Sequence, residues 1–190
     1  MRGQNKVILW SACKHSGKTT SALKLAQRAY AEGFSVAGLL APSVYLSGKL
    51  VGFDALDLRN NRRARLAERN PNKNGSARFT WLSAGLKLAR SALSRALAKP
   101  TDLIVVDEFG PLEMAGKGWR KNVDSLVTAT NALILLIVRE ELTNQVQELY
   151  ACVPSVKLPA TDPKSIYKVI AIIRNRRRRS ANCSKRTATA

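Results

Sequence analysis

The strongest constraint on the fold is a polar turn between an apolar segment and a helical one. Lys6–Trp10 is a short apolar run that predicts a buried strand. Thr19–Glu32 has helical periodicity, because small and apolar side chains recur on one face, and Gly33 is typical of a helix C-cap. The turn between them reads WSACKHSGKTT over residues 10–20. A strand joined to a helix in this way favours an α/β fold.

The end of this turn matches the second half of the phosphate-binding pattern G-x-x-x-x-G-K-[ST]. Ala12 stands where the first glycine of the pattern is usual. We expect backbone N–H groups to surround a phosphate at the positive end of the helix dipole. Lys18 would bridge the β- and γ-phosphates, and the Thr19 hydroxyl would ligate Mg²⁺. The expected nucleotide-binding residues are Lys14, His15, Ser16, Gly17, Lys18, Thr19 and Thr20. A chance polar turn is the alternative.

Two acids follow a second apolar strand, in the form of a Walker B motif. The run Asp102–Val106 leads directly into Asp107 and Glu108. Ligands of open α/β sheets bind at the carboxyl ends of the strands, which is where these two acids are expected. We predict that Asp107 holds Mg²⁺ through a water, and that Glu108 orients and deprotonates the attacking water. Two acids that merely cap a strand are the alternative.

The rest of the chain alternates apolar strands with amphipathic helices. Strands that are apolar throughout indicate a mainly parallel sheet with helices on both faces, which is a three-layer α/β fold. A turn at Ser47-Gly48-Lys49 predicts an antiparallel hairpin after the second strand. The further strands are expected at Phe34–Leu40, Ser43–Leu46, Leu50–Leu58, Ala132–Val138 and Ser155–Leu158, and the helices at Leu82–Leu97, Trp119–Thr128, Arg139–Tyr150 and residues 163–174.

The basic charge is concentrated in two segments. The chain has 32 Lys and Arg against 13 Asp and Glu, a net charge of +19. Residues 59–78 carry seven basic side chains against Glu68 and contain Pro71, so we expect a loop or lid. Residues 174–190 carry seven basic side chains and no large apolar residue, which predicts a disordered tail. We therefore predict one domain over residues 1–173 and a tail that could contact nucleic acid or an anionic surface without specificity.

Cysteine and histidine content excludes several kinds of site. The three cysteines lie far apart and form neither a disulfide framework nor a C-x-x-C metal pair, so a reduced, cytoplasmic setting is expected. The single histidine, His15, excludes a multi-histidine metal site. A nucleophilic Cys13–His15 pair is a remaining alternative. The longest apolar run, Ala132–Val138, is far shorter than the ~20 residues of a membrane helix.

An arginine is expected near the phosphates, because phosphoryl transfer gains from a cation that neutralises the transition state. Arg139 follows a buried strand and is expected at the same sheet edge, so we predict that Glu108, Lys18 and Arg139 are catalytic. A second source is the group Arg59, Arg62 and Arg63, which could close as a lid. No N-K-x-D box is present, so the sequence assigns no base preference. The expected partner is a nucleoside triphosphate, ATP or GTP. From their position in the chain, residues 158–162 are expected to line the binding site of the nucleotide base.

Residues 107–113, DEFGPLE, resemble the D-E-hydrophobic-G-x-x-E signature of a small P-loop nucleoside-triphosphatase family known from thermophiles and from a human cancer-related enzyme. Residues 48–54, GKLVGFD, resemble the G-x-x-x-G-F segment of the same family. The resemblance covers residues 5–173 and implies the P-loop NTPase fold and Mg²⁺-dependent hydrolysis of ATP, GTP and other nucleotides. Ala12 departs from the pattern, which implies weaker phosphate binding. Glu113 is expected to cap a helix or to support the site.

Two other functions are left open. A nucleotide or small-molecule kinase would use the arginine lid and transfer the phosphoryl group to an acceptor that Glu108 activates. A nucleotide-regulated adapter would bind nucleic acid through the basic tail. The loop SGKTT, residues 16–20, also resembles that of molybdopterin-dinucleotide accessory proteins. No oligomeric state follows from these patterns.

Overall fold

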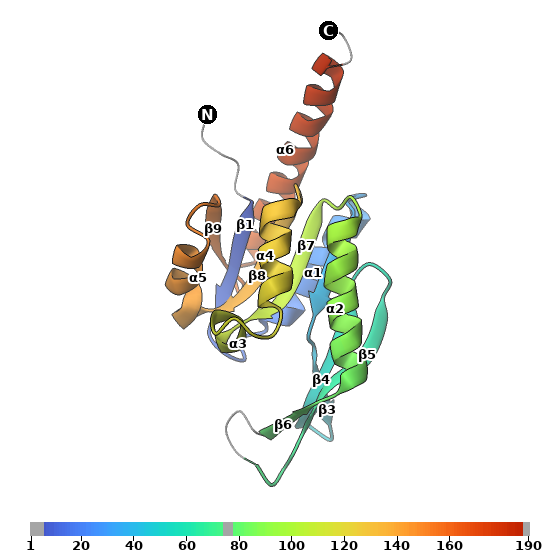
Figure 1. Ribbon diagram of the computed structural model, residues 1–190, viewed down its shortest axis with the longest axis vertical. Coiled ribbons are helices and arrows are strands. Elements are labelled where there is room, and N and C mark those ends of the chain that lie inside the picture. Colours follow the sequence, from blue (N-terminus) through green and yellow to red (C-terminus); the bar gives the residue numbers. More distant parts are fainter. Residues whose placement is uncertain (1–5, 74–77, 188–190) are drawn as a thin grey trace.

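The computed structural model describes residues 6–73 and 78–187 (Figure 1). Within these ranges the strands form one mixed sheet of nine strands. Parallel strands form its centre in the spatial order β2-β7-β8-β1-β9. These strands are β1 (Val7–Ala12), β2 (Val36–Leu40), β7 (Leu103–Phe109), β8 (Leu133–Arg139) and β9 (Ser155–Pro159).

Helices cover both faces of this sheet. Side chains of β1 alternate, so that Val7 and Leu9 join one buried cluster while Ile8 and Trp10 join the other. The first cluster includes side chains from α2, α4 and α5, and the second includes side chains from α1 and α6. The expected three-layer α/β fold is therefore confirmed. The helices are α1 (Lys18–Ala31), α2 (Ser83–Ala98), α3 (Pro111–Met114), α4 (Arg120–Ala129), a 3₁₀ turn at Glu140–Leu142, α5 (Thr143–Leu149) and α6 (Pro163–Thr187).

An antiparallel extension continues the sheet beyond β2. Its strands are β3 (Ser43–Leu46), β4 (Lys49–Asp57), β5 (Arg62–Arg69) and β6 (Phe79–Trp81). The turn between β3 and β4 has positive φ at both Ser47 and Gly48, as a two-residue I′ hairpin requires. The predicted hairpin after the second strand is thus present. Leu40, the last residue of β2, pairs with Leu56, so the first part of β4 extends past the carboxyl ends of the parallel strands.

The basic segment 59–78 is not the loop that its composition predicts. Residues 62–69 form β5, which pairs with β4 from Arg62 to Glu68. Leu66 and Ala67 are buried, so the strand is held by apolar contacts on one face while its arginines lie elsewhere. Tertiary pairing outweighs the charged composition here. Residues 74–77 of the segment lie outside the described residues.

The basic tail also differs from expectation, because α6 continues without a break to Thr187. The expected disorder is therefore wrong for residues 174–187. Arginine is a good helix former, and cations near a helix C-terminus interact favourably with the helix dipole. Arg174 contacts Glu32 at 2.5 Å, and Arg177 donates to the carbonyl of Gly33 at 3.0 Å. A domain limit at residue 173 stays a prediction, and residues 188–190 lie outside the described part of the chain.

No helix in the described ranges is both long enough and apolar enough to cross a membrane. The helix expected over Arg139–Tyr150 is shorter in the structure. Arg139 is the last residue of β8, a 3₁₀ turn follows it, and α5 begins only at Thr143.

Close packing of α2 on the extension depends on one glycine. A Cβ added at Gly85 would lie 2.3 Å from the carbonyl oxygen of Arg65 and 2.4 Å from the Cα of Leu66. Both contacts are with backbone, which cannot move aside as the end of a side chain can. Gly85 therefore lets α2 approach β5, and this contact fixes the extension to the main sheet.

We predict that Gly85→Ala lowers the free energy of unfolding by about 2 kcal/mol, because the added methyl group overpacks the contact between α2 and β5. In an exposed helix the same substitution stabilises by up to about 1 kcal/mol. Urea unfolding monitored by circular dichroism measures the change. Ser94→Ala, at an exposed position of the same helix, is the control and should be neutral or slightly stabilising. A stabilised Gly85→Ala variant would contradict this account of the packing.

Candidate active site

The loop between β1 and α1 folds around its own lysine. Lys18 is buried, and its ammonium donates hydrogen bonds to the carbonyls of Ala12 at 3.1 Å and Cys13 at 2.8 Å. Gly17, the N-cap of α1, has φ of 84°, a left-handed conformation that glycine adopts without strain. The Ser16 hydroxyl donates to the Cys13 carbonyl at 2.7 Å and closes the turn. The loop thus places a cation and the start of a helix at the same point.

Alanine fits the loop at position 12, where the common pattern has its first glycine. It is the last residue of β1, is buried, and pairs in register with Arg139 of β8. Positive φ occurs at His15 and Gly17 of this loop but not at Ala12. A side chain is therefore compatible with the backbone at this position, and the departure from the common pattern needs no strained conformation.

Thr19 and Asp107 meet where α1 begins and β7 ends. The Thr19 hydroxyl donates to Oδ2 of Asp107 at 2.7 Å, and the backbone N–H of Ala41 donates to the same oxygen at 3.0 Å. Burial raises the pKa of Asp107 to about 6, although these two hydrogen bonds and the charge of Lys18 act in the opposite direction. A buried carboxylate and a hydroxyl in contact form an oxygen donor pair of the kind that suits Mg²⁺.

Glu108 and Arg139 form an ion pair beside this position. Nε of Arg139 donates to Oε1 of Glu108 at 2.6 Å, and both side chains are about one third exposed. Glu108 is the last but one residue of β7 and Arg139 is the last residue of β8, and the parallel pairing of these strands brings the two together. The sequence placed both at the same sheet edge but did not indicate that they would contact each other.

Glu113 fixes the segment that follows Glu108. Its buried carboxylate accepts hydrogen bonds from the N–H of Gly110 at 3.0 Å and of Trp119 at 3.1 Å. Glu113 is the third residue of α3 and its side chain caps the helix by accepting the N–H of the N-cap residue Gly110, which agrees with the expected capping role; it also ties down the chain leading into α4. Burial raises the pKa of the Glu113 carboxyl, and the backbone hydrogen bonds oppose this shift. The bond to Trp119 had no signal in the sequence.

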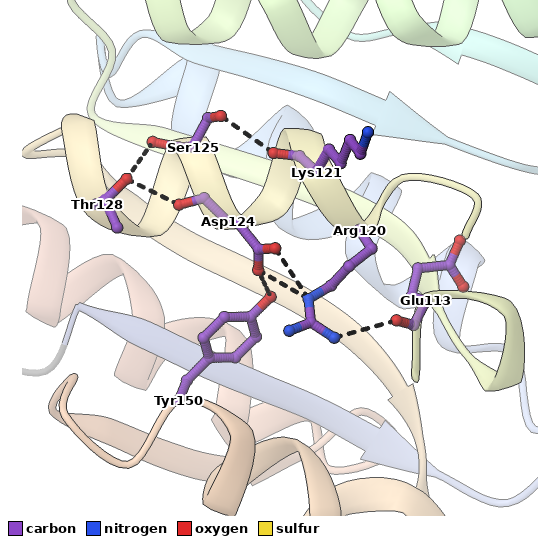
Figure 2. Close-up of polar contacts among 7 residues, drawn as sticks. All are labelled: Glu113, Arg120, Lys121, Asp124, Ser125, Thr128 and Tyr150. Atoms are coloured by element: carbon purple, nitrogen blue, oxygen red, sulfur yellow. Dashed lines mark hydrogen bonds and ion pairs between the residues drawn. The ribbon is translucent and has the colours of Figure 1, made fainter. Parts of the chain in front are cut away.

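A polar network extends from this segment to α5 (Figure 2). Arg120 donates to the Asp124 carboxylate at 2.8 Å and to the Glu113 carbonyl at 3.4 Å. The Tyr150 hydroxyl donates to the same carboxylate at 2.7 Å, and burial raises the pKa of Tyr150. The i, i+4 spacing of Arg120 and Asp124 is the one part of the network that sequence reasoning could have found.

Three arginines predicted as a lid do not lie at this site. Arg59 donates to the Pro100 carbonyl and the Thr101 hydroxyl, just before β7 begins. Arg62 and Arg63 pair in register with Asp57 and Leu56 within the antiparallel extension, and Arg63 lies 3.8 Å from the Asp54 carboxylate of β4. Arg59 is thus at the amino end of β7, whereas the phosphate-binding loop follows the carboxyl end of β1. The described contacts of these arginines, at Thr101 and in the β4–β5 pair, do not favour their closure over a nucleotide.

The remaining loop residues lie at the site, with side chains on its surface. Lys14, His15 and Thr20 are exposed. The Cys13 thiol donates to Glu140 at 3.3 Å, and this hydrogen bond, together with the carboxylate charge, raises the pKa of Cys13. A raised pKa disfavours the thiolate, so the arrangement does not support Cys13 as a nucleophile.

Comparison with known proteins identifies the same kind of fold and family. A family model described as NTPase matches residues 8–176. Nucleoside-triphosphatase THEP1 of Methanothermobacter thermautotrophicus is 32% identical over 137 residues, covering 71% of this chain and 78% of that protein. The protein of the same name from Methanocaldococcus jannaschii is 30% identical over 124 residues, covering 65% and 72%.

Two solved structures share the architecture. The solution structure of a human cancer-related nucleoside triphosphatase superposes with a TM-score of 0.65 at 19% identity, covering 90% of this chain and 96% of that one. The crystal structure of THEP1 from Aquifex aeolicus gives a TM-score of 0.63 at 18% identity, covering 88% and 96%. At these identities the likeness shows the fold.

We predict that Asp107→Asn changes the pH dependence of stability in the protein without nucleotide or metal. A carboxyl whose folded pKa lies above its unfolded value destabilises the fold above that folded pKa, and the cost falls as the pH drops toward 4. For a shift from 3.8 to about 6, the variant should gain about 2 kcal/mol over wild type between pH 4.5 and pH 8. Urea unfolding of both proteins at the two pH values measures this. A pH-independent difference would contradict the shift.

Proposed function

Because this chain belongs to the NTPase family, we propose that it is a Mg²⁺-dependent enzyme that cleaves the bond between the β- and γ-phosphates of a nucleoside triphosphate. By this membership the chain is a P-loop nucleoside-triphosphate hydrolase. The finer proposals concern the metal, the bond cleaved and the group that activates water. They are supported by the positions of Lys18, Thr19, Asp107 and Glu108.

The contact between Thr19 and Asp107 is the observation that carries the proposal. The two oxygens lie 2.7 Å apart where the phosphate-binding loop meets the end of β7. Mg²⁺ is usually held by one or two protein oxygens, with waters and substrate phosphates completing its shell. Among the side chains that the structure describes, in residues 6–73 and 78–181, no three or more His, Cys, Asp or Glu form a cluster suited to a metal, which favours a site completed by the substrate. When bound, Mg²⁺ supplies positive charge at the β- and γ-phosphate oxygens.

Lys18 and the loop backbone bind the triphosphate in this proposal. The Lys18 ammonium now occupies the loop interior by bonding two carbonyls. The same ammonium has three donors and can turn from these carbonyls to phosphate oxygens. N–H groups at the start of α1 and the positive end of its dipole add to the attraction. The charge that a β- or γ-phosphate needs is therefore already at the loop.

Glu108 and Arg139 divide the chemistry of the γ-phosphate between them. Glu108 accepts the proton of the attacking water, which requires a free carboxylate oxygen pointing at that water. Arg139 now bonds one of its oxygens at 2.6 Å. We propose that the triphosphate draws Arg139 to the γ-phosphate, where it neutralises developing charge, and so releases Glu108 for the water. The ion pair is then the resting arrangement of two groups that act separately during the reaction.

The alternative of a kinase is less well supported. Of its lid arginines, Arg59 contacts the amino end of β7, and Arg62 and Arg63 belong to the β4–β5 pair of the extension. The choice between ATP and GTP is left to experiment, and a cytoplasmic location is proposed on the scattered cysteines, of which Cys13 and Cys152 are free and exposed.

We predict that the purified chain releases inorganic phosphate from ATP, GTP and CTP and yields the matching diphosphates. Removal of divalent metal with EDTA should abolish the release, and added Mg²⁺ should restore it. Chromatography of the products identifies the bond cleaved. Monophosphate with pyrophosphate would contradict cleavage between the β- and γ-phosphates. A phosphorylated product formed only when nucleoside monophosphates are added would favour the kinase.

We predict that Glu108→Gln lowers kcat by about 10²- to 10⁴-fold, the range expected when a general base is removed. Nucleotide affinity should change little, because the amide keeps the shape of the side chain. Steady-state kinetics with a phosphate sensor and binding of a fluorescent nucleotide measure the two effects. Glu141→Gln, a nearby exposed position, is the matched control and should keep wild-type kcat. Unchanged turnover in Glu108→Gln would sink the assignment of Glu108.

A further inference from the structure

Positive charge gathers at the edge of the sheet where the parallel strands begin, opposite the candidate active site. Arg176 donates to the Asn131 carbonyl just before β8, and Arg177 donates to the Gly33 carbonyl just before β2. Arg59 bonds the Pro100 carbonyl just before β7. We call this surface the basic edge; its residues are Lys6, Arg59, Lys99, Arg174, Arg176, Arg177, Arg178 and Arg179.

The second half of α6 carries most of this charge. Ile173 is the last apolar residue of α6 that is buried, and side chains up to Arg177 still bond the body. The end of the helix then projects from the body (Figure 1). Five of residues 174–179 are arginines, and the sequence contains no acid after Asp162. Arginines spaced by three or four residues on a helix repel one another. A helix of this composition therefore concentrates positive charge.

The acids near the basic edge are already engaged. Glu32 is shared by Arg28 and Arg174, at 2.8 Å and 2.5 Å. Asp102 accepts hydrogen bonds from the N–H and the hydroxyl of Ser35. Burial lowers the pKa of Lys6, and the charge of Arg176 lowers it further. Positive charges thus face each other at this edge, and an external anion would relieve their repulsion.

We propose that the basic edge binds the phosphate backbone of a nucleic acid. Guanidinium groups form paired hydrogen bonds with phosphate oxygens, and arginine accounts for most of the charge. Residues 178–187 form a helical arm about 15 Å long, and an α-helix of about 10–12 Å diameter fits the major groove of B-DNA, about 12 Å wide. Duplex DNA is therefore the partner that the arm fits best.

An anionic membrane fits this surface less well. Helices that lie in the membrane interface carry a face of large apolar residues. Residues 174–187, RNRRRRSANCSKRT, contain none. The proposed binding also lies at the opposite strand ends from the Thr19–Asp107 contact, so it does not depend on the proposed hydrolysis.

The test uses the full chain and a fluorescent 20-base-pair DNA duplex without nucleotide, titrated at several KCl concentrations. Arg178→Gln/Arg179→Gln should lower the salt slope of log K by about 2, one for each phosphate that the variant no longer neutralises. At 0.1 M salt, that corresponds to about tenfold to hundredfold weaker binding. Phosphate release from ATP should be unchanged, because neither residue belongs to the candidate active site.

Lys87→Gln/Arg90→Gln is the matched control, since it removes the same charge from exposed positions of α2. It should leave the slope close to the wild-type value. An equal loss in both variants would overturn the proposal, because net charge alone would then explain binding. Stronger binding to phosphatidylserine vesicles than to DNA, with loss of only vesicle binding in the α6 variant, would overturn it in favour of a membrane.

Parallel titrations with single-stranded DNA and duplex RNA identify the form of nucleic acid, and equal or tighter binding of either would contradict the preference for duplex DNA.

Discussion

Parallel pairing of β1, β7 and β8 is the constraint on which the candidate site depends. The register sets Ala12 beside Arg139 and Val138 beside Phe109, so three distant segments end at one edge. A slip of one residue would turn every side chain of a strand to the other face. Both faces of these strands are buried under helices, and such a slip is therefore strongly disfavoured. The positions of the reactive groups thus follow from the burial of apolar side chains that take no part in the chemistry.

Much of the fold could be predicted because buried parallel strands are continuous apolar runs. β7 and β8 are recognisable in this way, and the loop before α1 has its own pattern. β5 was missed because its burial rests on Leu66 and Ala67 among five charged residues, and only pairing with β4 makes it a strand. The second half of α6 was missed because the prediction of disorder rested on composition. A basic segment without large apolar residues can still continue a helix that has already begun. The ion pair of Glu108 with Arg139 depends on three-dimensional proximity, which no local pattern encodes.

Rigid support surrounds the groups that the proposed reaction would move. Glu113 holds the backbone at Gly110 and Trp119, and Arg120 links the same segment to Asp124. The Tyr150 hydroxyl then joins α4 to the end of α5. Glu108 and Arg139, by contrast, are each about one third exposed and are held mainly by each other. Small rearrangements at the γ-phosphate can therefore occur without disturbing the buried network.

Helix α6 joins the two ends of the molecule as one continuous element. Its 25 residues span about 38 Å, from the loop after β9 at the carboxyl edge to the basic edge at the other. A rod of this kind acts as a lever, because a small tilt at its packed first half becomes a larger displacement at its projecting tip. If the two ends were coupled through this rod, thermodynamic linkage would make the effect mutual, with the same factor in both directions.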